Sequence, residues 1–153
     1  MRVLVTGGAG FIGANFLNLS VPRRRDVQFL NIDALTYAAN LESLKPMERE
    51  ENYRFERLDI TDREAVHQCF EQFRPNLVVH FAAESHVDRS IVGPAAFVRT
   101  NIEGTFNLLE AARGRIGAEP FLFHHVSTDE VYGSLGETGL FTEETAYDPS
   151  SPY

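Results

Sequence analysis

The fold of this chain is decided by one stretch near its start, Arg2-Val3-Leu4-Val5-Thr6-Gly7-Gly8-Ala9-Gly10-Phe11-Ile12-Gly13. Residues 2–5 form a β-rich run, and glycines at G-x-x-G-x-x-G spacing lead from it into apolar residues at helix-like intervals. Such glycines allow a tight turn, close approach of the backbone to a pyrophosphate and close packing of helix on strand, with the helix N-terminus facing the phosphates. An ordinary turn is the alternative, but the position between a strand and a helix predicts a dinucleotide site.

Beyond this stretch, β-rich runs and helical patterns alternate along the chain. We expect strands at residues 2–5, 27–32, 53–58, 77–81 and 121–126. Helices are expected at 11–19, 40–44, 62–73 and from Pro94 to the glycines at 114 and 117. Because each right-handed crossover needs a covering helix, the alternation predicts an α/β fold of the Rossmann type. The expected architecture is a doubly wound parallel sheet in the order 3-2-1-4-5, with helices on both faces and a ligand crevice at the ends of the first and fourth strands.

Composition and charge exclude several classes of protein. The 153 residues are 43% hydrophobic, which fits one domain with a real core. The net charge of -8 gives no electrostatic footprint for nucleic acid or an anionic membrane, and Arg23-Arg24-Arg25 is expected to be a solvated loop. No apolar stretch approaches the roughly 20 residues of a membrane span, and no signal peptide is visible, so a cytoplasmic protein is expected.

The cysteine and histidine residues do not suggest a metal site. The single cysteine, Cys69, follows an apolar helical pattern and is expected in the core rather than as a reactive thiol. His124 and His125 fall in a predicted buried strand and His80 at the end of another, so core or supporting roles are expected for them.

Three further segments follow predicted strands and extend the dinucleotide site. Asp33 lies twenty positions after Gly13 and is expected to accept hydrogen bonds from the adenosine ribose hydroxyls. A carboxylate there would repel a 2′-phosphate and no arginine stands beside it, which favours NAD over NADP. Asp59-Ile60 is a candidate for the adenine edge, with a loop leading into a helix as the alternative. The small residues of Phe81-Ala82-Ala83-Glu84-Ser85 allow close approach of the backbone to the cofactor, with a packing turn as the alternative.

An acidic pair follows the last predicted strand, in Ser127-Thr128-Asp129-Glu130-Val131-Tyr132-Gly133. Parallel α/β sheets keep their chemistry at the carboxyl ends of the strands, so Asp129 and Glu130 are candidates for an acid and a base beside the cofactor. The alternative is that these carboxylates only favour the start of a short helix.

Several of these stretches together resemble a known family. The glycine-rich stretch resembles the extended short-chain dehydrogenase/reductases, which act largely on nucleotide sugars. Three more narrow the resemblance to the dTDP-glucose 4,6-dehydratases: Asp33-Ala34-Leu35-Thr36-Tyr37-Ala38-Ala39-Asn40-Leu41, Ala82-Ala83-Glu84-Ser85-His86-Val87-Asp88-Arg89-Ser90-Ile91 and the stretch with the acidic pair. A 4-epimerase normally lacks the Asp-Glu pair, while GDP-mannose 4,6-dehydratases and UDP-glucuronate decarboxylases usually keep the Glu but not the preceding Asp. Ala39 departs from the family, which commonly has glycine there.

The resemblance implies a set of binding residues. Substrate is expected at Ser85 and Thr128. Tyr153 is expected as the tyrosine of a Tyr-x-x-x-Lys motif, whose lysine would lie four positions further on. Together with the glycine pattern, the resemblance implies NAD contacts at Gly7, Gly10, Phe11, Ile12, Gly13, Asp33, Ala34, Leu35, Thr36, Asp59, Ile60, Phe81, Ala82, Ala83, Glu84, Ser85, Thr100 and Tyr153.

The resemblance also implies a dehydration in three steps, catalysed by Asp129, Glu130 and Tyr153. Tyr153 takes the proton of the sugar C4 hydroxyl while hydride moves from C4 to NAD, for which the phenol needs a nearby cation. Glu130 then removes the C5 proton and Asp129 protonates the departing C6 hydroxyl, while Thr128 holds the C4 oxygen. Hydride finally returns to C6. Such an enzyme is an NAD-dependent hydro-lyase of deoxysugar biosynthesis, converting dTDP-glucose to dTDP-4-keto-6-deoxyglucose.

The resemblance covers about half of a family member. Residues 1–153 are therefore expected to be an incomplete NAD-binding domain without the C-terminal substrate-binding domain, and we expect the chain alone to be inactive. A non-catalytic NAD-binding fragment and a related nucleotide-sugar epimerase or decarboxylase remain as alternatives. Family members commonly pair as homodimers through long helices beside the fourth strand. An apolar stripe is compatible with that pairing and with packing on the domain's own sheet: Val98, Ile102, Thr105, Leu109 and Ala112.

Overall fold

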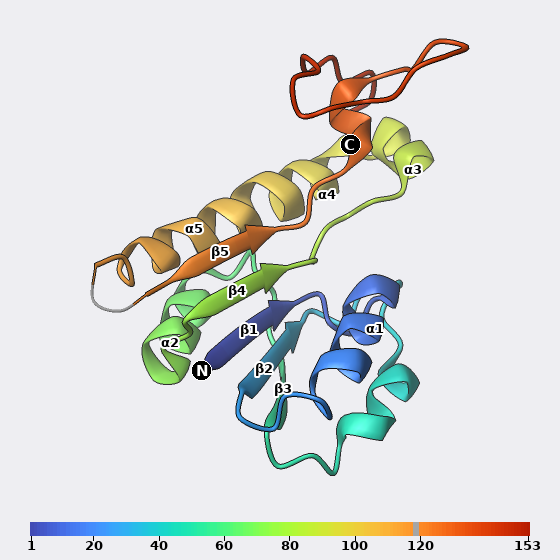
Figure 1. The fold of residues 1–153 in the computed structure, drawn as a ribbon. Coiled ribbons are helices and arrows are strands. Elements are labelled where there is room, and N and C mark those ends of the chain that lie inside the picture. Colours follow the sequence, from blue (N-terminus) through green and yellow to red (C-terminus); the bar gives the residue numbers. More distant parts are fainter. Residues whose placement is uncertain (118–119) are drawn as a thin grey trace.

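The computed structural model describes residues 1–117 and 120–153, and its strands form one parallel sheet (Figure 1). The strands stand in the order β3-β2-β1-β4-β5, so the predicted order is confirmed. β1 lies at the centre, between β2 and β4. The carboxyl ends of the strands therefore meet along one edge of the sheet. The strands are β1 (Arg2–Thr6), β2 (Gln28–Asp33), β3 (Tyr53–Arg57), β4 (Leu77–His80) and β5 (Leu122–His125).

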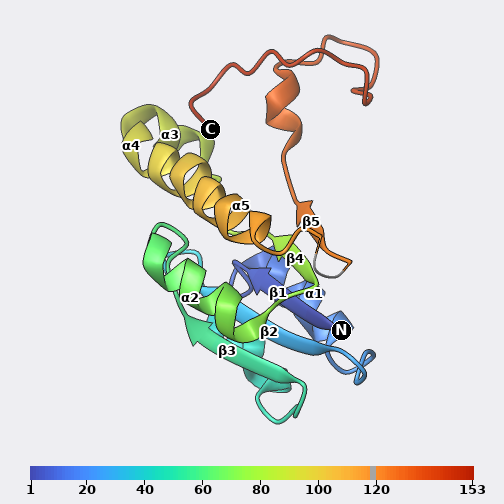
Figure 2. The ribbon, with the colours of Figure 1, turned by 90° about the vertical axis from the view of Figure 1, so that its left-hand side faces the viewer.

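Helices cover both faces of the sheet, which confirms the doubly wound architecture (Figures 1 and 2). α1 and η1 pack on one face, and α2 and α5 pack on the other. The 3-10 helix η1 continues through Pro46 to Met47, past residue 44 where the predicted helix ended, and the short helix α3 was not predicted. The helical elements are α1 (Phe11–Ser20), η1 (Leu41–Met47), α2 (Arg63–Phe73), α3 (Val87–Val92), α4 (Pro94–Phe97), η2 (Val98–Gly104), α5 (Thr105–Arg113) and η3 (Asp129–Tyr132).

The core consists of two apolar clusters, one on each side of the sheet. Along β1, Val3 and Val5 belong to the cluster under α1, whereas Leu4 belongs to the cluster under α2 and α5. Both sets are buried because a parallel sheet with helices on both faces hides alternate residues equally well. Cys69 lies in the second cluster, which confirms its predicted core position, and burial raises the pKa of its thiol to about 12.

The long helix that was predicted from Pro94 is confirmed as the continuous run α4, η2 and α5. The residues at its two junctions, Val98 and Thr105, keep right-handed helical dihedrals. The middle part, η2, is a π-helix, which the sequence did not predict. A π turn is wider than an α turn, so residues on either side of it leave the regular helical phase.

The predicted apolar stripe on this helix does not face the sheet. Val98, Ile102 and Leu109 are about half exposed or more, and only the last residue of the stripe, Ala112, is buried. The alternative that the whole stripe packs on the domain's own sheet is therefore wrong. The helix instead covers the sheet with Leu108 and small residues, because it approaches so closely that a Cβ on Gly104 would lie 2.6 Å from Ile60 Cδ1.

β5 is not the buried strand that the sequence predicted. It pairs with β4 on one side only among the described residues, so it forms the edge of the sheet there. Leu122, His124 and His125 are exposed, and Phe123 is half-buried. The apolar run from residue 121 is thus a strand, as predicted, but its two histidines are surface residues in the described part of the chain.

His80 is buried as predicted, and its titration should make the fold sensitive to acid. Burial, helped by the charge of neighbouring His125, lowers the pKa of His80 to about 4. A histidine of the unfolded chain takes up its proton near pH 6.5, so between pH 6.5 and 4 the unfolded state binds more protons and stability falls as the pH falls. The expected loss is on the order of 3 kcal/mol across this window, levelling off below pH 4. Urea unfolding at a series of pH values checks this, and His80→Asn should flatten the slope.

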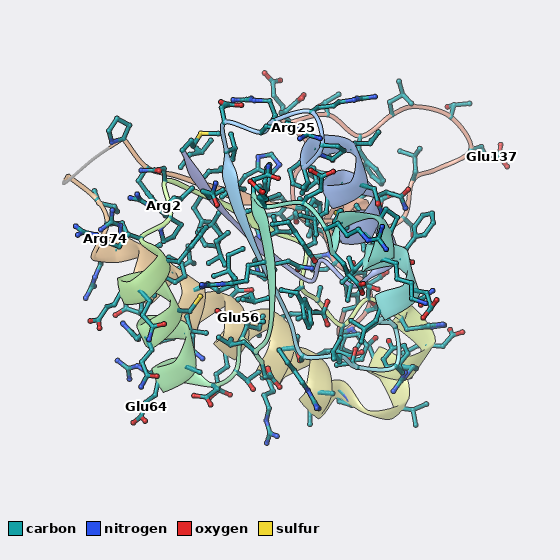
Figure 3. All side chains as sticks on the ribbon, turned by 90° about the horizontal axis from the view of Figure 1, so that it is seen from below. Arg2, Arg25, Glu56, Glu64, Arg74 and Glu137 are labelled. Atoms are coloured by element: carbon teal, nitrogen blue, oxygen red, sulfur yellow. The ribbon has the colours of Figure 1, made fainter. Side chains whose placement is uncertain are left out.

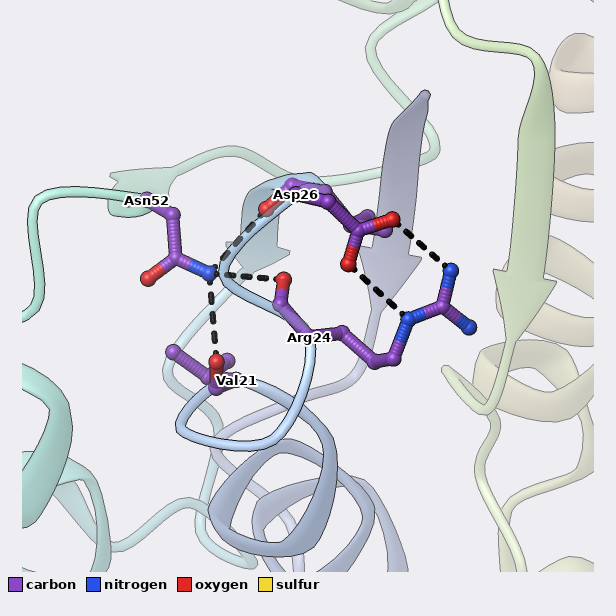
Figure 4. A network of polar contacts seen from close by, with 5 residues as sticks. Val21, Arg24, Asp26 and Asn52 are labelled. Carbon is purple, nitrogen blue, oxygen red and sulfur yellow. Dashed lines mark hydrogen bonds and ion pairs between the residues drawn. The ribbon is translucent and has the colours of Figure 1, made fainter.

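Asn52 ties together the turn that precedes β2 (Figure 4). Its buried amide nitrogen donates to the carbonyl oxygens of Val21, Arg24 and Val27 at 3.0–3.1 Å. The Arg23-Arg24-Arg25 cluster in the same turn is exposed, as predicted. Figure 3 likewise places Arg25, Glu64, Arg74 and Glu137 at the periphery of the molecule.

Removal of the Asn52 amide should destabilise the whole fold. Asn52→Ala removes the amide donor from the Val21 and Val27 carbonyls, while the Arg24 carbonyl still accepts from Val27 N at 2.9 Å. We expect the free energy of unfolding to fall by about 1–3 kcal/mol. Urea unfolding measures the change. Asn15→Ala is the matched control, because the Asn15 amide donates to a single exposed helix carbonyl, and a loss there as large as at Asn52 would contradict the interpretation.

Candidate functional site

A cavity of about 460 Å³ opens at the carboxyl edge of the sheet, next to the turn after β1 and the segment after β4. Its position agrees with the crevice predicted at the ends of the first and fourth strands. Glycines of the turn form one wall, and residues that follow β2, β3, β4 and β5 form the others. The lining residues are Gly7, Gly10, Phe11, Ile12, Gly13, Ile32, Asp33, Ala34, Thr36, Ala38, Ala39, Leu58, Asp59, Ile60, Phe81, Ala82, Ala83, Glu84, Ser85, Thr100, Val126, Ser127 and Tyr153.

The glycine turn is packed so tightly that side chains are excluded from it. Gly7 has φ +72°, and a Cβ there would lie 2.6 Å from the Ala82 nitrogen. A Cβ on Gly13 would collide with the Gly7 carbonyl oxygen and lie 2.7 Å from Gly8 Cα. α1 begins against this turn with Gly10 as its N-cap, and no side chain caps its first N–H groups. Free backbone N–H groups at a helix N-terminus are suited to a pyrophosphate, so the turn fits a dinucleotide.

Asp33 is held in place by two backbone groups. Its Oδ2 accepts a hydrogen bond from Ala9 N at 2.9 Å, and its Oδ1 accepts one from Leu35 N at 2.8 Å. Leu35 adopts φ +59°, the left-handed region, where the chain turns after β2. An ionised carboxylate has about four acceptor sites, so each oxygen keeps a lone pair for a ribose hydroxyl. The carboxylate therefore fits the predicted task while also linking the glycine turn to the segment after β2.

Sequence reasoning overlooked an arginine near this carboxylate. Arg57, at the end of β3, is the register partner of Asp33 in β2. The prediction that no arginine stands beside Asp33 therefore holds along the chain but not across the sheet. Within residues 1–117 and 120–153, no ion pair joins the two side chains, and Arg57 is exposed.

A contact across the two sides of the cavity joins the segment after β2 to the segment after β4. The Tyr37 hydroxyl donates to Glu84 Oε2 at 3.0 Å, and the Arg89 guanidinium lies 3.8 Å from the centre of the Tyr37 ring. Partial burial and the hydrogen bond to Glu84 raise the pKa of Tyr37. The backbone of Glu84 is itself fixed, because its N–H donates to Asn101 Oδ1 and its carbonyl accepts from Asn101 Nδ2, both at 2.8 Å.

The acidic pair lies at the start of η3, just beyond the lining of the cavity. Thr128 is the N-cap, and its Oγ1 accepts from Glu130 N at 3.2 Å. Asp129 is exposed and Glu130 is half-buried. The arrangement matches the helix-start alternative, and it also leaves both carboxylates at the edge of the sheet that carries the cavity. Ser127, directly before them, lines the cavity.

The segment after η3 folds back and brings Tyr153 to the cavity. Asp148 N donates to the Val131 carbonyl at 3.0 Å, and the Tyr132 ring stacks on Phe141 with centroids 5.2 Å apart. Tyr153 then packs edge-on against Phe97 of α4, with centroids 6.3 Å apart, and contributes to the cavity lining. A tyrosine well beyond η3 in the sequence is thus returned to the same edge of the sheet as the acidic pair.

The structure brings together almost all the predicted cofactor residues around this one cavity. Leu35 is the exception, because it supports Asp33 instead of lining the cavity. Substrate candidate Ser85 lines the cavity, and Thr128 caps η3 beside it. The prediction missed several lining residues next to predicted ones, where strand ends and turns were the available signal: Ile32, Ala38, Ala39, Leu58, Val126 and Ser127.

Two other kinds of feature are absent from the described part of the chain. No group of three or more His, Cys, Asp or Glu side chains comes together there to hold a metal ion. No helix in the same residues is long and apolar enough to cross a membrane.

The doubly wound parallel sheet, with a glycine turn and a cavity at its carboxyl edge, defines a Rossmann-type domain. A sequence model for the family described as GDP-mannose 4,6 dehydratase matches residues 4–153, so the chain belongs to this family. It is 56% identical to a probable dTDP-glucose 4,6-dehydratase of Sinorhizobium fredii, over 100% of this chain and 45% of that protein. The chain thus spans slightly less than half the length of the curated relatives that it matches.

Solved structures are similar over the whole chain. The dTDP-glucose 4,6-dehydratase of Streptomyces venezuelae, crystallised with NAD bound, has TM-score 0.88 and 43% identity, covering 100% of this chain and 47% of that one. The UDP-glucose 4-epimerase of Thermus thermophilus in complex with NAD has TM-score 0.85 and 35% identity, covering 100% of this chain and 46% of that one. The predicted likeness to the N-terminal portion of dTDP-glucose 4,6-dehydratases is thereby confirmed.

Proposed function

We propose that this chain is the cofactor-binding portion of an NAD-dependent dTDP-glucose 4,6-dehydratase. The observation that carries the proposal is the juxtaposition of three groups at one edge of the sheet: the cavity at the glycine turn, Tyr153 in its lining, and Asp129-Glu130 beside it. The overall reaction removes water from dTDP-glucose and yields dTDP-4-keto-6-deoxyglucose. The acidic pair favours dehydration over epimerisation, because loss of water needs both a base for the C5 proton and an acid for the C6 oxygen.

Residues of this chain would hold NAD by the groups that already face the cavity. The N-terminus of α1 would face the pyrophosphate, Asp33 would accept from the ribose hydroxyls, and the apolar Ile60 and Leu58 would hold the adenine. When bound, NAD supplies the acceptor for the C4 hydride and returns hydride to C6.

The proton transfers fall to side chains near Ser127. Tyr153 takes the proton of the C4 hydroxyl, and the lysine that lowers the cost of its ionisation belongs four positions further on. Oxidation at C4 makes the C5 proton acidic, so Glu130 removes it as Asp129 protonates the departing C6 hydroxyl. Thr128 and Ser85 orient the sugar. Adjacent carboxylates perform opposite tasks only if they hold different protonation states during the reaction.

The decisive experiment uses the longest natural form of the protein with NAD and dTDP-glucose. We expect mass spectrometry to show a product lighter by one water, with no net accumulation of NADH because hydride leaves and returns within one turnover. Conversion of UDP-glucose to UDP-galactose, with dTDP-glucose left unchanged, would instead support the epimerase alternative. The 153-residue chain alone is expected to bind NAD without turnover, and product formation by it would overturn that expectation.

The cofactor preference follows from Asp33, although Arg57 lies in the neighbouring strand. The carboxylate is fixed by two backbone N–H groups at the lining of the cavity, whereas Arg57 is exposed and makes no ion pair with it among the described residues. A 2′-phosphate would meet the carboxylate first, which favours NAD over NADP. Calorimetric titration with both dinucleotides tests this preference.

A homodimer and a cytoplasmic location complete the proposal. Val98, Ile102, Phe106 and Leu109 are about half exposed or more on one face of the long helix, and the described residues leave this face uncovered. A second copy of the same helix would cover it. Sedimentation of the protein and of an Ile102→Glu variant tests the dimer, and cell fractionation tests the location.

A further inference from the structure

A chain of hydrogen bonds runs beneath the cavity from the sheet to the long helix. Thr6 and His80 are the last residues of β1 and β4 and are register partners in the sheet. Thr6 Oγ1 lies 2.6 Å from His80 Nδ1, and His80 Nε2 lies 3.0 Å from Oγ1 of Thr105, the first residue of α5. Thr6 and His80 are fully buried, so water does not compete for these groups.

The backbone sets the direction of these hydrogen bonds. The N–H of Ala82 lies 3.3 Å from Thr6 Oγ1 and can only donate, so the Thr6 hydroxyl accepts it. The hydroxyl's own buried proton needs an acceptor, and His80 Nδ1 at 2.6 Å is the acceptor within reach, so we assign this proton to the bond with Nδ1. A neutral imidazole that accepts at Nδ1 carries its proton on Nε2, and it donates that proton to Thr105. The low pKa of the buried ring keeps it neutral at pH 7. His125 is the titratable group beside it, with its ring centre 5.1 Å away and tilted by 40°.

One end of this chain is a wall of the cavity. Ala82 lines the cavity and packs against the glycine turn, where a Cβ on Gly7 would lie 2.6 Å from the Ala82 nitrogen. The other end is the helix that also carries Thr100, a second lining residue. Backbone atoms are closely packed here, so a shift of a few tenths of an ångström at Ala82 would change the volume that is left for a ligand.

Resting on the proposed function, we infer that Thr6, His80 and Thr105 are positioning residues for the cofactor. None of them lines the cavity. Their hydrogen bonds hold the Ala82 peptide against the glycine turn and fix α5 to β4, which sets the width of the cavity in which NAD binds.

Two substitutions of Thr105 distinguish the effect of its hydroxyl from the effect of its side-chain volume. Thr105→Val keeps the shape but leaves His80 Nε2–H without an acceptor, whereas Thr105→Ser keeps the acceptor. In the 153-residue chain, we expect the Kd for NAD to rise about tenfold in Thr105→Val and to stay within about twofold in Thr105→Ser. Glu103→Ala, an exposed position on the same helix, is the control for helix changes in general. Equal Kd values for the Val and Ser variants, both folded by circular dichroism, would overturn the positioning role.

Two further measurements sharpen this test. Nitrogen-15 NMR of labelled histidine should show His80 neutral at pH 7 with its proton on Nε2, and a proton on Nδ1 would contradict the proposed direction. Thr6→Val with Thr105→Val should weaken binding by less than the product of the single losses, because both act through one ring. Loss of the full product would contradict a shared path. If Thr6→Val does not fold, the positioning role is tested by the Thr105→Val and Thr105→Ser variants and by the tautomer of His80. A native chain that binds no NAD would refute the proposed function itself, a different outcome from any of these.

Discussion

Gly13→Ala is expected to abolish measurable NAD binding and to weaken the fold. The added Cβ would collide with the Gly7 carbonyl oxygen and lie 2.7 Å from Gly8 Cα, and both neighbours are backbone atoms that no rotamer change can move. Either α1 is displaced or the turn opens. Overpacking of this kind costs about 1–3 kcal/mol of stability. It also moves the N-terminus of α1 away from the cavity, so we expect the Kd for NAD to rise by at least about 100-fold, measured by calorimetric titration.

A glycine elsewhere in the chain provides the matched control. A Cβ added at Gly136 would meet no heavy atom within 4 Å, so Gly136→Ala should leave both the Kd for NAD and the urea midpoint unchanged. A Gly13→Ala protein that bound NAD like the native chain would show that close packing of α1 on the turn is not needed for binding.

The fold could be read from the sequence where local pattern and tertiary packing agree. In β1, every residue from Val3 to Thr6 is buried, and a continuous apolar run between turn signals predicts such a central strand. The long helix was harder, because apolar residues occur on both of its faces. Gly104, Leu108 and Ala111 face the interior, while Ile102 and Leu109 remain exposed. The spacing of apolar residues therefore cannot show which face packs on the sheet, because the close approach of the helix at Gly104 decides this and the size of the side chains does not.

The site could be read from the sequence where it lies along one segment, but not where it forms across the sheet. The glycine turn and Asp33 were predicted from their spacing and their positions after predicted strands, and their geometry fits a dinucleotide. The proximity of Arg57 to Asp33 arises from strand pairing between β2 and β3, so it could not be predicted from the spacing of residues along the chain. The hydrogen bond from Tyr37 to Glu84 joins residues 47 apart, because the segments after β2 and β4 meet at the carboxyl edge of the sheet. Such pairs become visible only once the strand order and register are known.

Glu130→Gln in the longest natural form of the protein is expected to lower kcat for dehydration by about 10²–10⁴-fold, the usual contribution of a general base. The NAD affinity should stay unchanged, because Glu130 does not line the cavity. The helix-start alternative predicts a different result: loss of one charge at the first turn of η3 would cost only about 0.3–1 kcal/mol of stability and leave the chemistry intact. Glu137→Gln, in the exposed loop beyond η3, is the control for a general loss of negative charge.

Deuterium exchange separates the roles of the two adjacent carboxylates. If Glu130 removes the C5 proton and Asp129 protonates the C6 oxygen, Asp129→Asn should still oxidise C4 and exchange C5 hydrogen with D₂O, while its loss of water is slowed. Glu130→Gln should oxidise C4 but show no exchange at C5. Each variant replaces a carboxylate by its amide, and the two positions are adjacent, so changes in folding or cofactor binding cannot produce opposite exchange results. Rapid exchange in Glu130→Gln would assign the base to another residue and reduce the acidic pair to its helix-start role.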